Sequence, residues 1–153
     1  MAHKHKPNNM FYELPFICQE FTYSVSSGDV LYPSESVKDL GIIVTSDISW
    51  SAHVQKIVSS AKAMGSWVLS AFKSRDRLTM LTLYKSLVRS HLDNCCPLWH
   101  PHQMSNIQIL EGVQRKFTSR IWDVQHLNYW DRLKSLRLMS LQRRRERYII
   151  IQI

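Results

Sequence analysis

The sequence predicts an α+β fold that is mostly α: a short antiparallel sheet or hairpin at about residues 21–44, followed by four to five helices. Two observations lead to this prediction. Residues 21–44 alternate β-forming side chains with turn residues, whereas apolar side chains after residue 50 recur at spacings of three and four. We therefore expect an irregular lead-in at 1–20, a β region at 21–48 and a helical region at 49–153.

The composition is that of a globular protein. With 153 residues, of which 44% are hydrophobic, the chain is long enough to bury one ordinary core. No run of about 18 uncharged apolar residues occurs, and the start has no apolar stretch suited to a signal peptide, so neither membrane nor secretion is indicated. Three cysteines do not make a disulfide framework. An intracellular, reducing compartment is the simpler expectation.

The positive charge is concentrated in the second half of the chain. Residues 1–76 carry seven Lys and Arg and seven Asp and Glu, whereas residues 77–153 carry thirteen and five, which accounts for the net charge of +8. A basic field of this kind favours polyanions such as nucleic acid. A basic surface that is only well solvated fits the same counts, so charge alone leaves both readings open.

The β region predicts a hairpin and one further strand. Phe21–Val25 and Val30–Tyr32 are rich in β-forming residues and flank a turn near Gly28. Val37–Val44 is expected to add a third antiparallel strand, in which Gly41 allows a bend or close packing. Three strands are the minimum for a stable sheet face.

Helical periodicity predicts the remaining elements. A first helix spans about 52–72 with Ser51 as its N-cap, and Gly65 in its middle suggests the close approach of another helix. A central, mostly buried helix runs from Arg77 to about Cys95, where Pro97 stops it. Its apolar stripe, which is expected to face the core, comprises Leu83, Tyr84, Leu87, Val88, His91, Leu92 and Cys95.

Three shorter helical segments follow. One opens at Met104 or Ser105, with Ile107, Leu110, Val113, Phe117 and Ile121 inward. Asn128 is expected to cap a helix at Tyr129–Leu136, and Ser140 a last one.

Three stretches of the chain resemble reverse transcriptases of LINE-type non-LTR retrotransposons. They are Val37–Trp50, Leu83–Leu92 with the following Cys-Pro-Leu-Trp, and Leu136–Tyr148. The resemblance covers about residues 21–153 and implies the end of a catalytic palm followed by a helical thumb. Two departures are Ser90, where family members commonly have proline, and Arg137, which replaces the glycine of a Leu-Gly-Leu turn.

The resemblance also implies what is missing. Reverse transcriptases use two metal ions held by carboxylates, partly on a Tyr/Phe-x-Asp-Asp turn. No Asp-Asp or Asp-x-Asp occurs here, and the matched portion begins after the place of that turn. We therefore expect a catalytically incomplete remnant of an RNA-directed DNA polymerase, with no catalytic residue, no cofactor and no enzyme activity of its own.

A cluster of cysteine and histidine residues offers zinc-binding side chains without zinc-binding spacing. Two adjacent cysteines point about 100° apart on a helix, and no second Cys-x-x-Cys or His-x-x-x-His pair exists. A Cys-His nucleophile pair lacks a third group to orient the histidine. We predict no metal at this cluster, which comprises His91, Cys95, Cys96, His100 and His102.

The remaining candidate chemistry is phosphate binding. Five tryptophans could stack bases, but Trp67 and Trp99 lie beside or after apolar stripes, so core positions are favoured for most. Arginine pairs well with phosphate, and a thumb holds a primer-template duplex by its backbone. At least two arginines of the run at 143–147 must face solvent. The candidate nucleic-acid-binding residues are Arg115, Lys116, Arg120, Arg132, Lys134, Arg137, Arg143, Arg144, Arg145 and Arg147.

Two kinds of partner follow from this interpretation. The first is RNA or an RNA/DNA duplex, bound through phosphate contacts. The alternative is an orphan helical interaction domain with no nucleic-acid role, whose exposed apolar surface contacts a missing palm domain or another protein. A solvated basic face remains the third reading of the arginine run.

Overall fold

The computed structural model describes residues 23–24, 30–31 and 34–151, which belong to two separate units, Met1–Pro33 and Ser34–Ile153. In the first unit, β1 (Tyr23–Ser24) and β2 (Val30–Leu31) pair antiparallel, with Tyr23 opposite Leu31. This pairing confirms the predicted hairpin. Its expected turn near Gly28, the lead-in at 1–20 and the last two residues lie outside the described residues.

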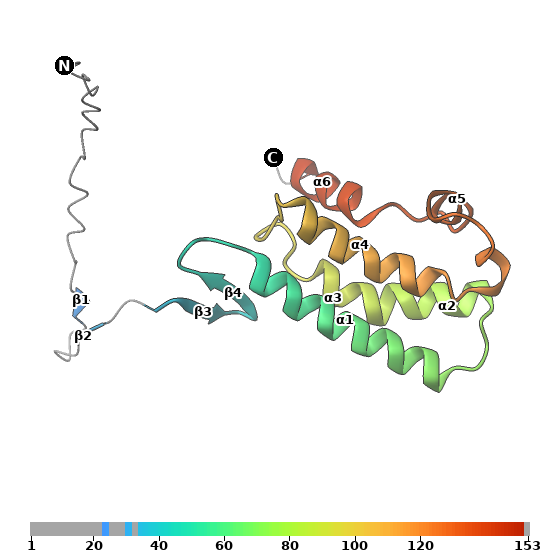
Figure 1. The fold of residues 1–153 in the computed structure, drawn as a ribbon, viewed down its shortest axis with the longest axis horizontal. Helices are drawn as coiled ribbons and strands as arrows, with labels where there is room; N and C mark the ends of the chain where they lie inside the picture. Colours follow the sequence, from blue (N-terminus) through green and yellow to red (C-terminus); the bar gives the residue numbers. More distant parts are fainter. Residues whose placement is uncertain (1–22, 25–29, 32–33, 152–153) are drawn as a thin grey trace, which may run out of the picture. The chain divides into compact units, whose positions relative to one another are not determined.

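The second unit is a β-hairpin followed by a helical bundle (Figure 1). The described part of the chain confirms the α+β, mostly α, fold class. No helix in this part is long and apolar enough to cross a membrane. In order, its elements are β3 (Ser36–Asp39), β4 (Ile42–Thr45), α1 (Ser51–Ala71), α2 (Arg77–Leu83), the π-helical turn η1 (Tyr84–Val88), α3 (Arg89–Asp93), α4 (Met104–Thr118), the 3-10 turn η2 (Trp122–Val124), α5 (Tyr129–Ser135) and α6 (Leu141–Ile151).

The segment predicted as a single third strand, Val37–Val44, is itself a hairpin. Strands β3 and β4 pair antiparallel with Val37 opposite Val44, and Leu40 and Gly41 form the two-residue turn with φ of 45° and 87°. Positive φ at both positions is the geometry whose twist suits a tight hairpin. The described strands therefore form two separate two-stranded sheets rather than one three-stranded sheet.

Helix α1 begins one residue earlier than predicted. Trp50 occupies the N-cap position, and Ser51 is the first helical residue, whose hydroxyl accepts a hydrogen bond from Asn106 Nδ2 at 3.1 Å. Gly65 faces α4 as expected, since a Cβ there would lie 3.5 Å from the Phe117 ring. That distance is an ordinary packing contact, so the approach of α4 is close without excluding a methyl group.

The central helix contains a π-helical turn and ends earlier than the apolar pattern suggested. Asp76 caps α2 by accepting from Thr79 N at 2.9 Å, and α3 ends at Asp93. The prediction of Cys95 in the core is wrong, because Cys95 lies in a left-handed turn with φ of 49° and is exposed. Its neighbour Cys96 is buried instead.

The core of the helical unit lies between α1, the central helix and α4. Of the predicted stripe on the central helix, Tyr84, Val88 and Leu92 are fully buried. Three further members of the stripe are only half-buried: Leu83, Leu87 and His91. On α4 and just after it, the predicted inward residues are buried except Ile107, which is half-buried: Leu110, Val113, Phe117 and Ile121.

Both predicted caps near the end of the chain are confirmed. Asn128 accepts from Asp131 N at 3.0 Å, and Ser140 accepts from Arg143 N at 3.3 Å. Between the two helices, Arg137 N donates to Lys134 O at 3.1 Å and Leu138 N donates to Leu133 O at 2.9 Å. These two bonds form a Schellman motif, in which the residue after the cap takes a left-handed conformation. Arg137 does so with φ of 52°.

We predict that Arg137→Gly stabilises the protein. The left-handed conformation costs a residue with a Cβ about 1 kcal/mol, a penalty that glycine avoids, and Arg137 is exposed. The free energy of unfolding, measured in urea, should rise by about 1 kcal/mol. Arg137→Ala removes the same charge but keeps the Cβ, so it should show no such gain. An unchanged or lower stability for the glycine variant would contradict the strain at this turn.

Candidate nucleic-acid interface

A buried chain of hydrogen bonds fixes the elements that carry the basic side chains. Tyr84 donates to Gln114 Oε1 at 2.7 Å, and Gln114 Nε2 donates to Tyr129 Oη and to Met139 O, both at 3.1 Å. Tyr129 in turn donates to the Glu111 carboxylate, which also accepts from Leu141 N at 2.9 Å. We call this set the Gln114 chain. It ties η1, α4, α5 and the start of α6 together.

The two tyrosines of the Gln114 chain remain protonated donors. Burial raises the pKa of Tyr84 well above its usual value. Burial, together with the hydrogen bond to Glu111, raises the pKa of Tyr129. Neither phenol ionises near neutral pH, so the Gln114 chain keeps both hydroxyl donors there.

Two of the predicted phosphate-binding residues face the interior. Arg132 is buried and donates to Leu127 O at 2.9 Å, Arg115 O at 3.1 Å and Val124 O at 3.4 Å. Arg145 is 2% exposed, donates to Leu92 O at 3.1 Å and stacks on the Trp99 ring at 4.9 Å. Burial lowers the pKa of Arg145. In this conformation both guanidinium groups hold the fold together and are not available to a phosphate.

Arg144 is also engaged within the protein. Its Nε lies 3.0 Å from Asp93 Oδ2, and its guanidinium lies 5.0 Å from the centre of the Tyr148 ring. Asp93 forms a second ion pair with Arg89, whose Nε lies 3.4 Å from the same carboxylate oxygen. This half-buried network joins α3 to α6.

The other seven predicted basic residues are exposed, and we call them the basic set. Arg143 and Arg147 belong to it, which confirms that at least two arginines of the run face solvent. Among the described residues, one member has an ion pair: Lys134 lies 3.7 Å from Asp131, and both are exposed, so the pair contributes little. The set is Arg115, Lys116, Arg120, Lys134, Arg137, Arg143 and Arg147.

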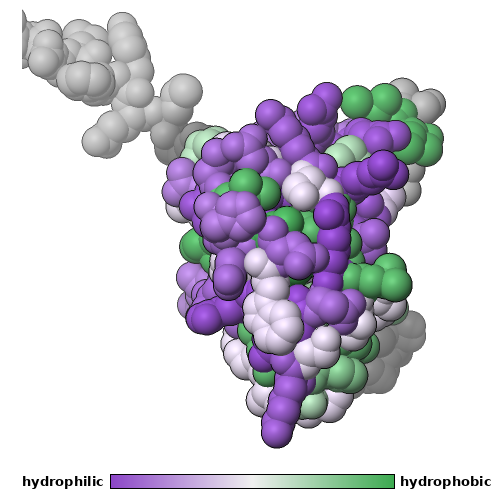
Figure 2. Space-filling view, turned by 90° about the vertical axis from the view of Figure 1, so that its right-hand side faces the viewer, coloured by the Kyte–Doolittle hydropathy of each residue, from purple (hydrophilic) through white to green (hydrophobic). Residues whose placement is uncertain are grey.

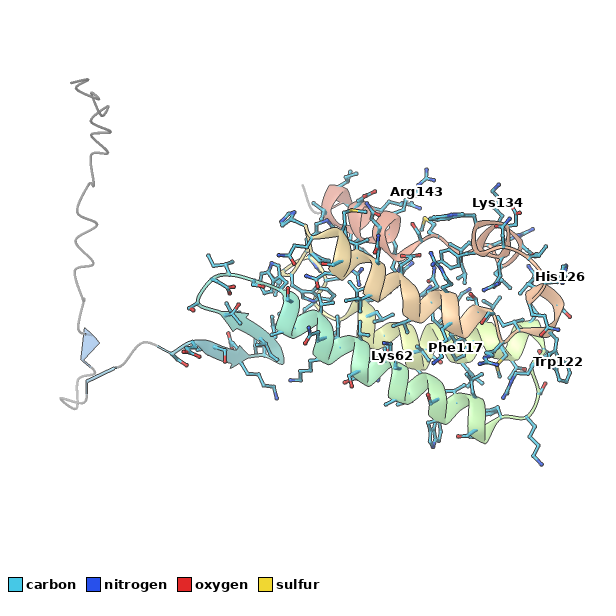
Figure 3. The ribbon with its side chains drawn as sticks, viewed as in Figure 1. Lys62, Phe117, Trp122, His126, Lys134 and Arg143 are labelled. Atoms are coloured by element: carbon cyan, nitrogen blue, oxygen red, sulfur yellow. The ribbon has the colours of Figure 1, made fainter. Side chains whose placement is uncertain are left out.

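The surface around the basic set is mixed rather than apolar. Lys134 on α5 and Arg143 on α6 lie along the same upper side of the unit (Figure 3). The end of the unit near α2 and α5 shows mainly hydrophilic side chains, with separate hydrophobic ones between them (Figure 2).

Lys62 on α1 is a further exposed basic residue that the sequence analysis did not identify, and it lies near the basic set. A shallow groove of about 40 Å³ runs between α1 and α4, with Lys62 and Lys116 on its opposite walls. Gly65, Val113 and Phe117 lie among its lining residues. The sequence does not single out Lys62, because its position across the groove from Lys116 arises only from the packing of the two helices.

A larger cleft of about 400 Å³ lies where α4 and α5 meet the start of α6. Arg115 and Trp130 line it, together with Met104, Ile107, Gln108, Glu111, Ser140 and Gln142. The Arg115 guanidinium lies 4.8 Å from the centre of the Tyr129 ring, whose centre is 5.2 Å from that of Trp130. The lining of the cleft therefore combines a cation, one aromatic ring and polar side chains.

The tryptophans divide between core and surface. Trp99 is fully buried, as predicted. The core position expected for Trp67 is wrong, because this side chain is 57% exposed. Trp122 and Trp130 are each 60% exposed, which the sequence did not indicate.

The cysteine and histidine cluster does not converge on one point. Burial raises the pKa of the Cys96 thiol, while Cys95 faces solvent. The His100 and His102 rings are 5.6 Å apart, and burial lowers the pKa of His100. Within the described ranges, no three His, Cys, Asp or Glu side chains are grouped as a metal site would require. The absence of a bound metal stays a prediction.

Comparison with known proteins gives little further guidance. No family model matches the chain, and no solved structure matches it significantly. The chain is similar to uncharacterized protein B0403.1 of Caenorhabditis elegans, with 25% identity over 112 residues, which is 71% of this chain. The matched region is 57% of that protein, so the chain spans little more than half the length of this relative.

We predict very different stability effects for substitutions at two arginines that lie two residues apart. Arg145→Gln should lower the free energy of unfolding by about 2–3 kcal/mol, because it leaves Leu92 O without its charged donor and removes the stacking on Trp99. Arg143→Gln should change it by less than about 0.5 kcal/mol, since its side chain is exposed. Urea denaturation measures both, and equal effects would contradict the different burial of the two side chains.

Proposed function

We propose that the helical unit binds nucleic acid through its phosphate backbone, as the thumb-like part of a catalytically incomplete retrotransposon RNA-directed DNA polymerase. The supporting observation is the basic set, seven exposed cations on or next to α4, α5 and α6 with almost no acidic partner among the described residues. Residues 34–153 as a whole contain 18 Lys and Arg against nine Asp and Glu.

The arrangement favours contacts that position the protein on the phosphate backbone over contacts that recognise particular bases. Guanidinium and ammonium groups pair well with phosphate oxygens, and phosphate contacts orient a protein without carrying sequence information. The Gln114 chain supplies the rigidity, because it holds three basic elements against the central helix. The expected ligand is RNA or an RNA/DNA duplex.

The second support is the resemblance to LINE-type reverse transcriptases. In this proposal, Val37–Trp50 forms the end of the palm, and the segments at 83–99 and 136–148 belong to the thumb. The first of these segments includes β3 and β4, and the second includes part of the central helix. The third includes the turn at Arg137 and most of α6. Arg137, which replaces the glycine of the family's Leu-Gly-Leu turn, has a left-handed conformation with φ of 52°.

We predict that binding is salt-dependent and follows the basic set. If about four residues neutralise phosphates, log K should fall against log salt with a slope on the order of −3 to −4 on duplex. Replacing Arg120, Arg143 and Arg147 by Gln should flatten that slope by about 1 to 3 units and weaken all sequences alike. Fluorescence anisotropy with a labelled RNA/DNA duplex measures the slope.

A matched control variant distinguishes binding by the basic set from binding that depends only on the net charge of the protein. Lys38, Lys56 and Lys85 are exposed and lie on β3, α1 and η1, so their replacement by Gln removes the same charge elsewhere. The control variant should keep nearly the original slope. Equal flattening in the two variants would mean that binding depends on net charge alone.

A second candidate function is an interaction domain with no nucleic-acid role. The observation that favours it is the apolar surface of the β3–β4 hairpin, where Val37 and Val44 face each other across the strands, 55% and 38% exposed. Leu40 and Ile48 nearby are 85% and 71% exposed. Such side chains suit contact with a palm domain or another protein. Absence of nucleic-acid binding at low salt would favour this function.

The proposed function also predicts that the chain does not polymerise on its own. Two-metal nucleotide transfer needs closely held carboxylates, and the sequence has no Asp-Asp or Asp-x-Asp. Primer extension with purified protein, nucleotides and Mg²⁺ or Mn²⁺ should yield no product. Template-dependent extension that persists after removal of contaminating polymerase would contradict the incomplete-enzyme interpretation.

A further inference from the structure

We propose that the cleft between α4, α5 and α6 binds one unpaired base of a single-stranded nucleic acid, stacked on Trp130. The inference rests on the proposed function and adds a preference to it: the basic set contacts the backbone, while the cleft takes a base that duplex pairing would keep stacked inside the helix.

Trp130 is placed as a stacking platform rather than as a core residue. Its side chain is 60% exposed, and it lines the cleft from the first turn of α5. Its neighbour Tyr129 is buried and held by the Gln114 chain, with the two ring centres 5.2 Å apart. A tryptophan presented from a rigid element loses little freedom when a base stacks on it, and stacking accepts any base because each has a π-face.

The cleft has the size and lining of a small-ligand site. Its volume of about 400 Å³ falls within the range common for ligand pockets. Met104 and Ile107 give one part of the wall apolar character, and Gln108 and Gln142 supply both donors and acceptors. An unpaired base has the matching combination of an apolar face and a polar edge.

Charge determines which part of a nucleotide enters. Glu111 lies among the lining residues, and its carboxylate, which accepts from Tyr129 and Leu141 N, repels a phosphate inside the cleft. Arg115 lines the same cleft, and Lys134 follows Trp130 by one helical turn on α5. These two cations suit the phosphates on either side of the bound base.

The two other exposed tryptophans provide matched controls. Trp67 on α1 and Trp122 in η2 are 57% and 60% exposed, and neither lines this cleft. Loss of either ring removes a similar exposed aromatic surface without affecting the proposed site. A general affinity of tryptophan for bases would therefore affect all three positions, whereas a site in the cleft affects Trp130.

The test compares a single strand with a duplex. Binding of labelled oligo(U), and of an RNA/DNA duplex of equal length, is measured by fluorescence anisotropy for the wild type and for Trp130→Ala, Trp67→Ala and Trp122→Ala. Trp130→Ala should weaken single-strand binding about tenfold, since stacking on an aromatic ring has an effect of this order. Duplex binding should change less than about twofold, and Trp130→Phe should recover most of the single-strand affinity.

A spectroscopic measurement keeps the test independent of the alanine variant. In a Trp67→Phe/Trp122→Phe protein, oligo(U) should quench tryptophan fluorescence more strongly than the duplex does, and Trp130→Phe in addition should abolish the difference. Equal quenching by both ligands would overturn the proposal, as would equal single-strand losses for Trp130→Ala and Trp122→Ala.

The outcomes separate the two levels of inference. If duplex binding is normal and Trp130→Ala has no effect on single-strand binding, the proposed base site is contradicted. The proposed backbone-binding surface is then unaffected. Failure of the wild type to bind either ligand at low salt would contradict both the base site and the backbone-binding surface. A parallel loss of single-strand and duplex affinity in Trp130→Ala would also overturn the base site, because it would assign Trp130 to the general surface.

Discussion

The position of every basic element depends on one buried side chain, Gln114. Its amide accepts from Tyr84 of the central helix and donates both to Tyr129 of α5 and to the carbonyl of Met139, just before α6. A buried amide left without partners would cost about 1–3 kcal/mol, so the three elements are held in one mutual arrangement. The hydrophobic core alone would specify that arrangement less strictly, since apolar contacts are not directional.

The arginines of the second half serve two different physical purposes. Arg132 and Arg145 donate to carbonyl oxygens near the ends of helices and in turns, and so join segments that are distant in the sequence. Arg143 and Arg147, on the same helix as Arg145, extend into solvent. The arginines at 143–147 look alike in the sequence, but helix geometry places some in the interior and others in solvent, because successive residues point about 100° apart.

Local features of the fold could be predicted from sequence, whereas features set by distant contacts could not. The caps at Asn128 and Ser140 need only a polar side chain immediately before a helical pattern. The β3–β4 turn was missed because Leu40 is not a residue that favours positive φ. Cys95 was misplaced because α3 ends at Asp93, before the apolar pattern does. The burial of Arg145 depends on a carbonyl 53 residues away, and the cleft at Trp130 on three helices.

The π-helical turn at Tyr84–Val88 explains how the central helix presents a straight apolar face. Its fully buried side chains, Met80, Tyr84, Val88 and Leu92, are spaced by four residues. In a regular α-helix a spacing of four drifts by about 40° per step, so the face would wind around the helix and leave its partner. A wider turn in the middle absorbs part of this drift. The helix can therefore keep α1 as a neighbour along both η1 and α3, and a single residue deleted from this turn would rotate everything after it away from that neighbour.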